Sequence, residues 1–144
     1  SNPLNFSFME ATFGQTTTAG AGTTLSNGKR SATSYTALGG PPTPGNFNFV
    51  LTLDNATPNS SAIVGVGFPG TPPYIPIGDG AVIIDIFQPY SILPISFVTD
   101  PSGRATFAAP IPSAPAGLTF AVQWAFVDSG NGAVVVSKGM LIQL

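Results

Sequence analysis

Neither cysteine nor histidine occurs anywhere in this chain of 144 residues. Without cysteine there is no disulfide, no thiol nucleophile and no thiolate metal site, and cysteine usage gives no information about the compartment. Without histidine the commonest general base and metal ligand is absent, so a Ser-His-Asp triad is impossible and a zinc site would need carboxylates alone. These two absences remove most of the side-chain chemistry used by hydrolases and metalloenzymes.

Charge is scarce as well. Four Lys or Arg and six Asp or Glu residues give a net charge of −2 and a charged fraction of 7%, whereas a typical soluble domain carries about 25%. These isolated charges form no basic stripe, so we expect no binding to the phosphates of nucleic acid. A surface with so few charges is weakly protected against self-association.

Long hydrophobic runs are also missing. The 17 glycines and 15 prolines interrupt every apolar run well before the roughly 18 residues that a membrane helix needs. We therefore expect a protein that does not span a membrane. With 43% apolar residues and 11 phenylalanines, the chain has enough apolar side chains to fold around one core.

What the sequence does contain is an alternation of apolar and polar residues with a period of two, the pattern of a half-buried β-strand. It is strongest in residues 47–54, 118–127 and 133–144. In the last of these, Lys138 interrupts the apolar face, which indicates a β-bulge beside Gly139. No helical period of useful length accompanies this alternation.

Shorter strands are expected at residues 32–38, 61–68, 81–87, 92–98 and 103–108. Turn residues separate them, and the turn at 100–103 predicts a hairpin between 92–98 and 103–108. The loop between residues 126 and 134 is the next best hairpin candidate. About 8–10 short strands at this spacing predict an all-β fold, an antiparallel β-sandwich of Ig-like or jelly-roll-like form.

We divide the chain into three parts. Residues 1–13 form an N-terminal strand, residues 14–31 a flexible linker of small residues or a weak edge strand, and residues 32–144 the β-sandwich domain. Two proline-rich segments, 39–46 and 69–76, are expected to be connectors.

Paired carboxylates remain as a conceivable route to catalysis, as in glycoside hydrolysis. The nearest candidates, Asp79 and Asp85, would lie roughly 20 Å apart on an extended strand. We interpret Asp79 as the cap of the turn at 78–80, and Asp85 as the partner of Arg104 or Lys138. We therefore expect no enzyme and no cofactor.

Two further features suggest ligands. The stretch 128–132 is similar to a calcium loop, but it has one carboxylate and no closing glutamate, so we interpret it as a hairpin turn. Trp124 alternates with Phe and Val and is expected in the core, whereas Tyr74 and Tyr90 are the better candidates for contact with a glycan. Triplets that would accept N-glycosylation begin at Asn5, Asn55 and Asn59.

The C-terminal part carries a series of short motifs. In order they are the turn at 100–103, the pair Ile111-Pro112, the strand from Gly117-Leu118 to Gln123, and the closing Ser137-Lys138-Gly139-Met140. Over about residues 35–144 the chain resembles a poorly characterised β-sandwich domain of exported proteins from planctomycetes and similar bacteria. Many members of that group carry cysteines and a longer N-terminal part, which this chain lacks. The resemblance implies export and an all-β fold, and it implies no activity.

The N-terminal region has its own pattern. Residues 3–13 alternate strongly, and they precede the small polar residues of 14–31. A strand on such a tether can complete the sheet of a neighbour, as in donor-strand pilus-like polymers, which gives a head-to-tail assembly that does not close. The candidate donor-strand anchors are Leu4, Phe6, Phe8 and Phe13. The alternative is that this strand pairs within its own domain.

Two hypotheses for the function follow. The first is a non-enzymatic extracellular structural protein, the subunit of a self-assembling filament that is a homopolymer. The second is a monomeric secreted binding module of the cell surface, for carbohydrate or a protein partner. A capsid or other shell protein with a jelly-roll fold is a third interpretation, and the shape of the assembly would distinguish it from a filament.

We expect an extracellular or cell-surface location, with export through a signal peptide that has been removed. The chain begins at Ser1 without a methionine, and its abundance of Thr, Ser, Asn and Gly is common in exported β proteins. A sequence trimmed at this point is the alternative explanation of its start.

Overall fold

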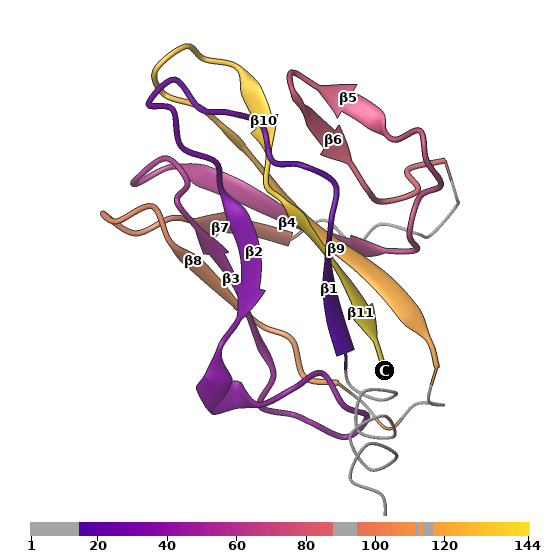
Figure 1. Cartoon of the computed structure of the whole chain (residues 1–144). Helices are drawn as coiled ribbons and strands as arrows, with labels where there is room; N and C mark the ends of the chain where they lie inside the picture. Colours follow the sequence, from indigo (N-terminus) through magenta and orange to yellow (C-terminus); the bar gives the residue numbers. More distant parts are fainter. Residues whose placement is uncertain (1–14, 88–94, 112, 114–116) are drawn as a thin grey trace, which may run out of the picture.

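Two antiparallel sheets face each other across an apolar core, and a small hairpin stands beside the larger sheet (Figure 1). This is a computed structural model, and it describes residues 15–87, 95–111, 113 and 117–144. The predicted all-β antiparallel sandwich is confirmed. Within the described ranges no helix is long and apolar enough to cross a membrane, and the 3₁₀ turn η1 (Ala37–Gly39) is the helical element.

The larger sheet is built mainly from the C-terminal half of the chain. Its strands, in spatial order, are β1 (Gln15–Ala19), β11 (Gly139–Gln143), β9 (Thr119–Val127), β4 (Ser61–Gly67) and β7 (Ile95–Val98). A further strand, β10 (Val134–Val136), pairs with the other part of β9. The edges of this sheet are therefore β1 and β7.

The smaller sheet has the order β2 (Ala32–Tyr35), β3 (Val50–Asp54), β8 (Ala105–Ala108). The separate hairpin consists of β5 (Ile75–Ile77) and β6 (Gly80–Val82). β2 lies over β11, to which it is joined by a bridge between Ala32 and Lys138. At the other side of the sandwich β8 lies over β7, where the rings of Phe97 and Phe107 are 5.6 Å apart.

Alternation along the strands builds the core, as the sequence predicts. On β9, Val122, Trp124 and Phe126 point between the sheets, and from the facing sheet Leu51 and Leu53 meet them. Trp124 has no exposed surface, which confirms its predicted place in the core. Burial of these side chains away from water is the main stabilisation of a fold without disulfides.

The predicted bulge lies at Lys138. Val136 pairs with Ala125 and Met140 pairs with Val122, so three residues on one strand face two on β9. The extra residue turns its peptide groups toward the other sheet. The Lys138 N–H donates to the carbonyl of Ser31 at 3.0 Å, and the Lys138 carbonyl accepts from the Thr33 N–H at 3.1 Å. The bulge thus joins the two sheets by backbone hydrogen bonds.

Gln123, which faces outward from β9, is 5% exposed because the segment after β6 covers it. Its amide oxygen accepts from the Ile83 N–H at 2.9 Å. Its amide nitrogen donates to the carbonyls of Ala81, at 2.6 Å, and Ser137, at 2.8 Å. One side chain therefore binds the β5–β6 region and the bulge to the larger sheet.

The predicted hairpin between residues 92–98 and 103–108 is wrong, because β7 pairs with β4 and β8 pairs with β3 in the opposite sheet. The turn at 100–103 does form, with the Gly103 N–H donating to the Asp100 carbonyl at 3.0 Å. It carries the chain across the core instead of back along the same sheet. The corner between β3 and β4 packs on it, since the Ala56 N–H donates to the Gly103 carbonyl at 3.0 Å. The second predicted hairpin, formed by β9 and β10, is confirmed.

Three segments differ in extent from their prediction. Residues 15–19, within the segment 14–31 that was expected to be a linker or a weak edge strand, form the edge strand β1 of the larger sheet. β5 begins in the last two residues of the segment 69–76, which was predicted as a proline-rich connector. Of the strand expected at 81–87, the first two residues belong to β6, because Ile83 and Ile84 leave the ladder to pack on the outer face of the larger sheet.

We expect Gln123→Met to lower the free energy of unfolding by about 3 kcal/mol or more. Methionine fills a similar volume but leaves the Ile83 N–H and the Ser137 carbonyl buried without a partner and the half-buried Ala81 carbonyl without its bond, at about 1–3 kcal/mol for each buried group. Urea denaturation measures the change. Gln143→Met, on the half-buried end of β11, is the matched control and should change stability by less than about 1 kcal/mol. Equal effects of the two substitutions would contradict the role of Gln123.

Candidate functional site

An apolar groove of about 240 Å³ lies between the two sheets. Phe49, Phe107 and Ile111 line it from the side of the smaller sheet. Val66, Phe120 and Leu144 line it from the larger sheet. These residues stand where β4, β8 and β11 end and where β9 begins, so the groove lies at the end of the sandwich marked by the C-terminus in Figure 1.

The groove opens toward one side of the sandwich. The lining residues on the side of β7 and β8, including Ile95, Phe107 and Ala109, are half-buried, whereas Ile142 on β11 and Leu144 just after it are buried. β7 and β8 are the edges of their sheets, and among the described residues neither pairs with a second strand. An apolar interior therefore reaches water between two strands whose outward backbone groups have no strand partner in the described ranges.

The N-terminal segment enters the fold at this same end. Gln15, the first described residue, pairs with Gln143, next to the groove residue Leu144. The predicted donor-strand anchors Leu4, Phe6, Phe8 and Phe13 lie outside the described residues. The groove thus lies at the same end of the sandwich as the point where the segment that carries these anchors joins β1.

Tyr74, one of two predicted ligand contacts, borders a separate hollow of about 220 Å³ beside the β5–β6 hairpin. Its ring is half-buried and packs against the cluster of Ile83, Ile84 and Ala121. Asp85 and Phe87 line the same hollow, which therefore offers both polar and apolar surface. Tyr90, the second predicted contact, lies outside the described residues.

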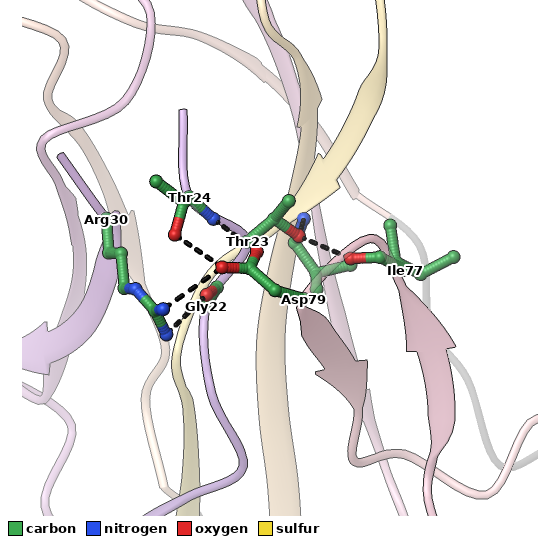
Figure 2. A network of polar contacts seen from close by, with 7 residues as sticks. Gly22, Thr23, Thr24, Arg30, Ile77 and Asp79 are labelled. Atoms are coloured by element: carbon green, nitrogen blue, oxygen red, sulfur yellow. Dashed lines mark hydrogen bonds and ion pairs between the residues drawn. The ribbon is translucent and has the colours of Figure 1, made fainter. Parts of the chain in front are cut away.

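Asp79 forms a polar cluster at the tip of this hairpin (Figure 2). It was expected to cap its own turn, but its carboxylate accepts from the backbone N–H of Thr24, at 2.7 Å, and from the Thr24 hydroxyl. Arg30 Nη2 lies 3.0 Å from the same carboxylate. The hydrogen bonds from the Thr24 side chain and backbone lower the pKa of Asp79, and Arg30 adds to this. The cluster fastens the hairpin to residues 20–30 and brings no second carboxylate to Asp79.

Two of the other acids have structural contacts. Arg104, one of the partners predicted for Asp85, pairs instead with Asp54, with Nε and Oδ1 3.3 Å apart. Asp85 accepts a hydrogen bond from the Phe87 N–H at 3.1 Å. In the part of the chain that the structure describes, no three His, Cys, Asp or Glu side chains gather as metal ligands.

Asp128 is buried in the loop that the sequence predicts as a hairpin turn. Its carboxylate accepts from the backbone N–H and the hydroxyl of Ser26, at 2.7 and 3.0 Å, and from the Gly130 N–H at 3.0 Å. The backbone hydrogen bonds from Ser26 and Gly130 lower the pKa of this carboxyl group. A carboxylate occupied in this way holds the loop at 25–30 against the end of β9.

The outward side of the larger sheet carries a second apolar surface. We define the outer apolar face as Ile63, Val98, Val127 and Val134, of which Val98 and Val134 are 71% and 61% exposed. The strands that carry these residues, β4, β7, β9 and β10, contain no ionisable residue. Val134 pairs with Val127, and Val98 pairs with Ser61, so these exposed apolar side chains share one face with a serine among them. Exposed apolar side chains gathered on one face are typical of a contact with another protein.

No protein-family profile matches the sequence, and neither a curated protein nor a solved structure is significantly similar to it. The resemblance to exported planctomycete domains therefore remains a prediction. The groove, the hollow beside Tyr74 and the outer apolar face have to be interpreted from the residues of this chain alone.

Sequence reasoning missed the groove, because its lining residues follow the ordinary pattern of core positions. Phe49 and Phe120 belong to strands that were predicted with the correct apolar face. Which core positions stay uncovered depends on how far each strand extends past its neighbour in the opposite sheet. No local sequence pattern indicates which core positions stay uncovered. A sheet of three strands is, however, too narrow to cover every inward residue of a sheet with more strands.

We expect stability to fall on acidification below about pH 4, where a carboxyl group with an ordinary pKa near 3.9 becomes protonated. The pKa of Asp128 is lowered in the folded protein, so its contribution is complete above its unfolded pKa and is lost as pH falls through the folded value. Asp128→Asn should therefore lower the urea midpoint at pH 6, and the difference from the wild type should shrink toward pH 2. Ser129→Ala, an exposed neighbour, is the control. A difference that stays constant with pH would contradict the assignment.

Proposed function

We propose that this protein is a non-enzymatic extracellular structural protein, the subunit of a pilus-like filament in which each N-terminal strand completes the sandwich of the next subunit. The observation that carries the proposal is the apolar groove between β7 and β8, edge strands that pair with no second strand among the described residues, at the end where the N-terminal segment joins the fold. An inserted strand would satisfy both the apolar walls and the edge peptide groups.

The energetics support an inserted apolar segment. Each square ångström of apolar surface removed from water contributes about 25 cal/mol, and the groove is lined almost wholly by apolar side chains such as Phe49, Phe107 and Phe120. Residues 3–13 provide alternating apolar side chains of the required kind, with Leu4, Phe6 and Phe8 on one face. Because donor and acceptor are different surfaces, the contact repeats from subunit to subunit without closing.

The surface composition also supports assembly. A chain with 7% charged residues has little electrostatic repulsion between its copies, and the outer apolar face would be covered by lateral contacts in a fibre. Export to the cell surface agrees with the abundance of Thr, Ser, Asn and Gly and with the resemblance to exported domains. It places the subunit where such fibres act.

Negative-stain electron microscopy tests the proposal. We expect fibres from the full chain and none from a variant that lacks residues 1–13, because that variant keeps the groove but has no strand to donate. Adding a peptide of residues 1–13 to the truncated variant should give capped monomers and no fibres. A triple variant, Leu4→Ser with Phe6→Ser and Phe8→Ser, keeps the length of the segment and should also fail to polymerise. A full chain that stays monodisperse under all conditions would overturn the filament.

A second candidate function is a monomeric binding module for carbohydrate, which the hollow beside Tyr74 favours. It combines an aromatic ring with polar groups near Asp85, the two features that a sugar site uses. If this function is correct, a panel of immobilised oligosaccharides should bind the full chain, and Tyr74→Ala should weaken binding about tenfold or more. Phe47→Ala removes an exposed ring from a different loop and is the control. Equal binding by both variants would exclude the hollow as the site.

A further inference from the structure

We infer that the free edge of β8, and not that of β7, receives the donated strand, and that the groove takes up one or two of its apolar side chains. This inference rests on the filament proposed above and names the surface through which it forms. The occupant is the segment 3–13 of a second copy of the chain.

The hydrogen-bond pattern of β8 identifies its unused groups. The Ala109 N–H donates to the Phe49 carbonyl at 2.9 Å, and in the same register Phe107 faces Leu51. Because alternate residues of an antiparallel strand direct their peptide groups to the same side, residues 105, 107 and 109 face β3. The N–H and carbonyl groups of Thr106 and Ala108 therefore point away from β3, toward the open side.

The side chains of this segment also favour β8. Phe107, Ala109 and Ile111 point into the groove, so a strand added beside them would place its own inward side chains in the same space. β7 contributes one groove residue, Ile95. The next inward residue of β7, Phe97, is already covered by the rings of Phe107 and Trp124, each 5.6 Å away.

Pro110 limits how far the added strand can pair. After Thr106 and Ala108, residue 110 is the next one whose peptide groups point to the open side of β8. It is a proline, which has no N–H to donate. The edge therefore offers the N–H groups of two residues, and pairing is confined to a short segment. A short acceptor suits a donor that has a few anchors followed by a tether.

The location of the edge favours a second copy as the donor. In its own subunit the segment leaves β1, which lies at the opposite edge of the larger sheet from β7. Four strand spacings of about 4.8 Å separate these edges, a crossing that would use roughly six extended residues. That crossing would take up residues 9–14, including the candidate anchor Phe13, whereas all of residues 3–13 are available when the donor is a second copy.

The volume of the groove sets the number of anchors. An apolar cavity of about 150 Å³ accommodates a benzene ring, so the space of about 240 Å³ has room for one phenyl ring and part of a second. Of the four candidate anchors, we therefore expect one or two neighbouring positions of the Leu4, Phe6, Phe8 face to dominate. To test this, Leu4, Phe6, Phe8 and Phe13 are each replaced singly by serine. We expect fibres to be lost only in the variants at the one or two dominant positions.

The first test blocks each edge with proline in the full chain. Thr106→Pro with Ala108→Pro removes the two outward N–H groups while the bonds of β8 to β3 remain. We expect fibres to disappear while the circular dichroism spectrum of the β-sheets is kept. Ser96→Pro, at an outward position of β7 that is not part of the outer apolar face, is the control and should leave fibres intact. Fibre loss from Ser96→Pro but not from the β8 variant would overturn the inference while leaving the filament standing.

The second test uses the absence of native cysteine and does not depend on proline being tolerated. A donor variant, Asn5→Cys or Ser7→Cys, is mixed with a size-tagged acceptor variant, Thr106→Cys or Ala108→Cys, and oxidised. We expect a mixed disulfide dimer with these acceptors and at least tenfold less with Ser96→Cys or Val98→Cys. A dominant product at β7, or an internal disulfide when Ser7→Cys and Ala108→Cys are placed in one chain, would refute the inference. Fibres that form without a cross-link at either edge would also refute the inference. A wild-type protein that forms no fibres would refute the proposed function itself.

Discussion

The extra residue at Lys138 is the constraint on which the rest of the fold depends. Because β10 and β11 are offset by one residue against β9, the peptide groups of Lys138 leave the larger sheet and bind Ser31 and Thr33 of the smaller one. The hydroxyl of Ser137, the residue before Lys138, accepts from the backbone N–H of Trp124 at 3.0 Å. It also lies 3.1 Å from the Thr33 hydroxyl. The amide of Gln123 adds the β5–β6 region to the same junction. Loss of these hydrogen bonds would loosen the larger sheet, the smaller sheet and the β5–β6 region from one another.

The position of the links explains why the opposite end is open. The Lys138 bonds and the packed corners at Ala56 and Gly103 join the sheets at the end away from the C-terminus. Toward the other end the sheets have mainly apolar contact, and there the smaller sheet does not cover all the inward residues of β9 and β11. Directional hydrogen bonds at one end therefore fix the sandwich, while the other end keeps an apolar groove, the acceptor of the strand in the proposed filament.

The sequence predicted the strands better than their partners. Alternation located β3, β4, β9 and the bulge at Lys138, because the inward face of a strand is a local property. The hairpin across residues 100–103 was wrong because a turn has the same residues whether the chain returns beside itself or crosses to the other sheet. Asp79 and Gln123 were not predictable as links, since their partners at Thr24 and Ile83 are distant in sequence. The groove depends on strand ends in two sheets and has no local signal.

Assembly through apolar insertion fits a chain without redox or pH-sensitive side chains. With neither cysteine nor histidine, the side chains that ordinarily change state between about pH 5 and 8 are absent, and the lowered pKa values of Asp79 and Asp128 keep these carboxylates charged into acid. A contact between apolar anchors and an apolar groove is likewise insensitive to salt screening, unlike one made of ion pairs. The composition from which we expect no enzyme would therefore also keep the proposed fibre intact when pH or salt changes.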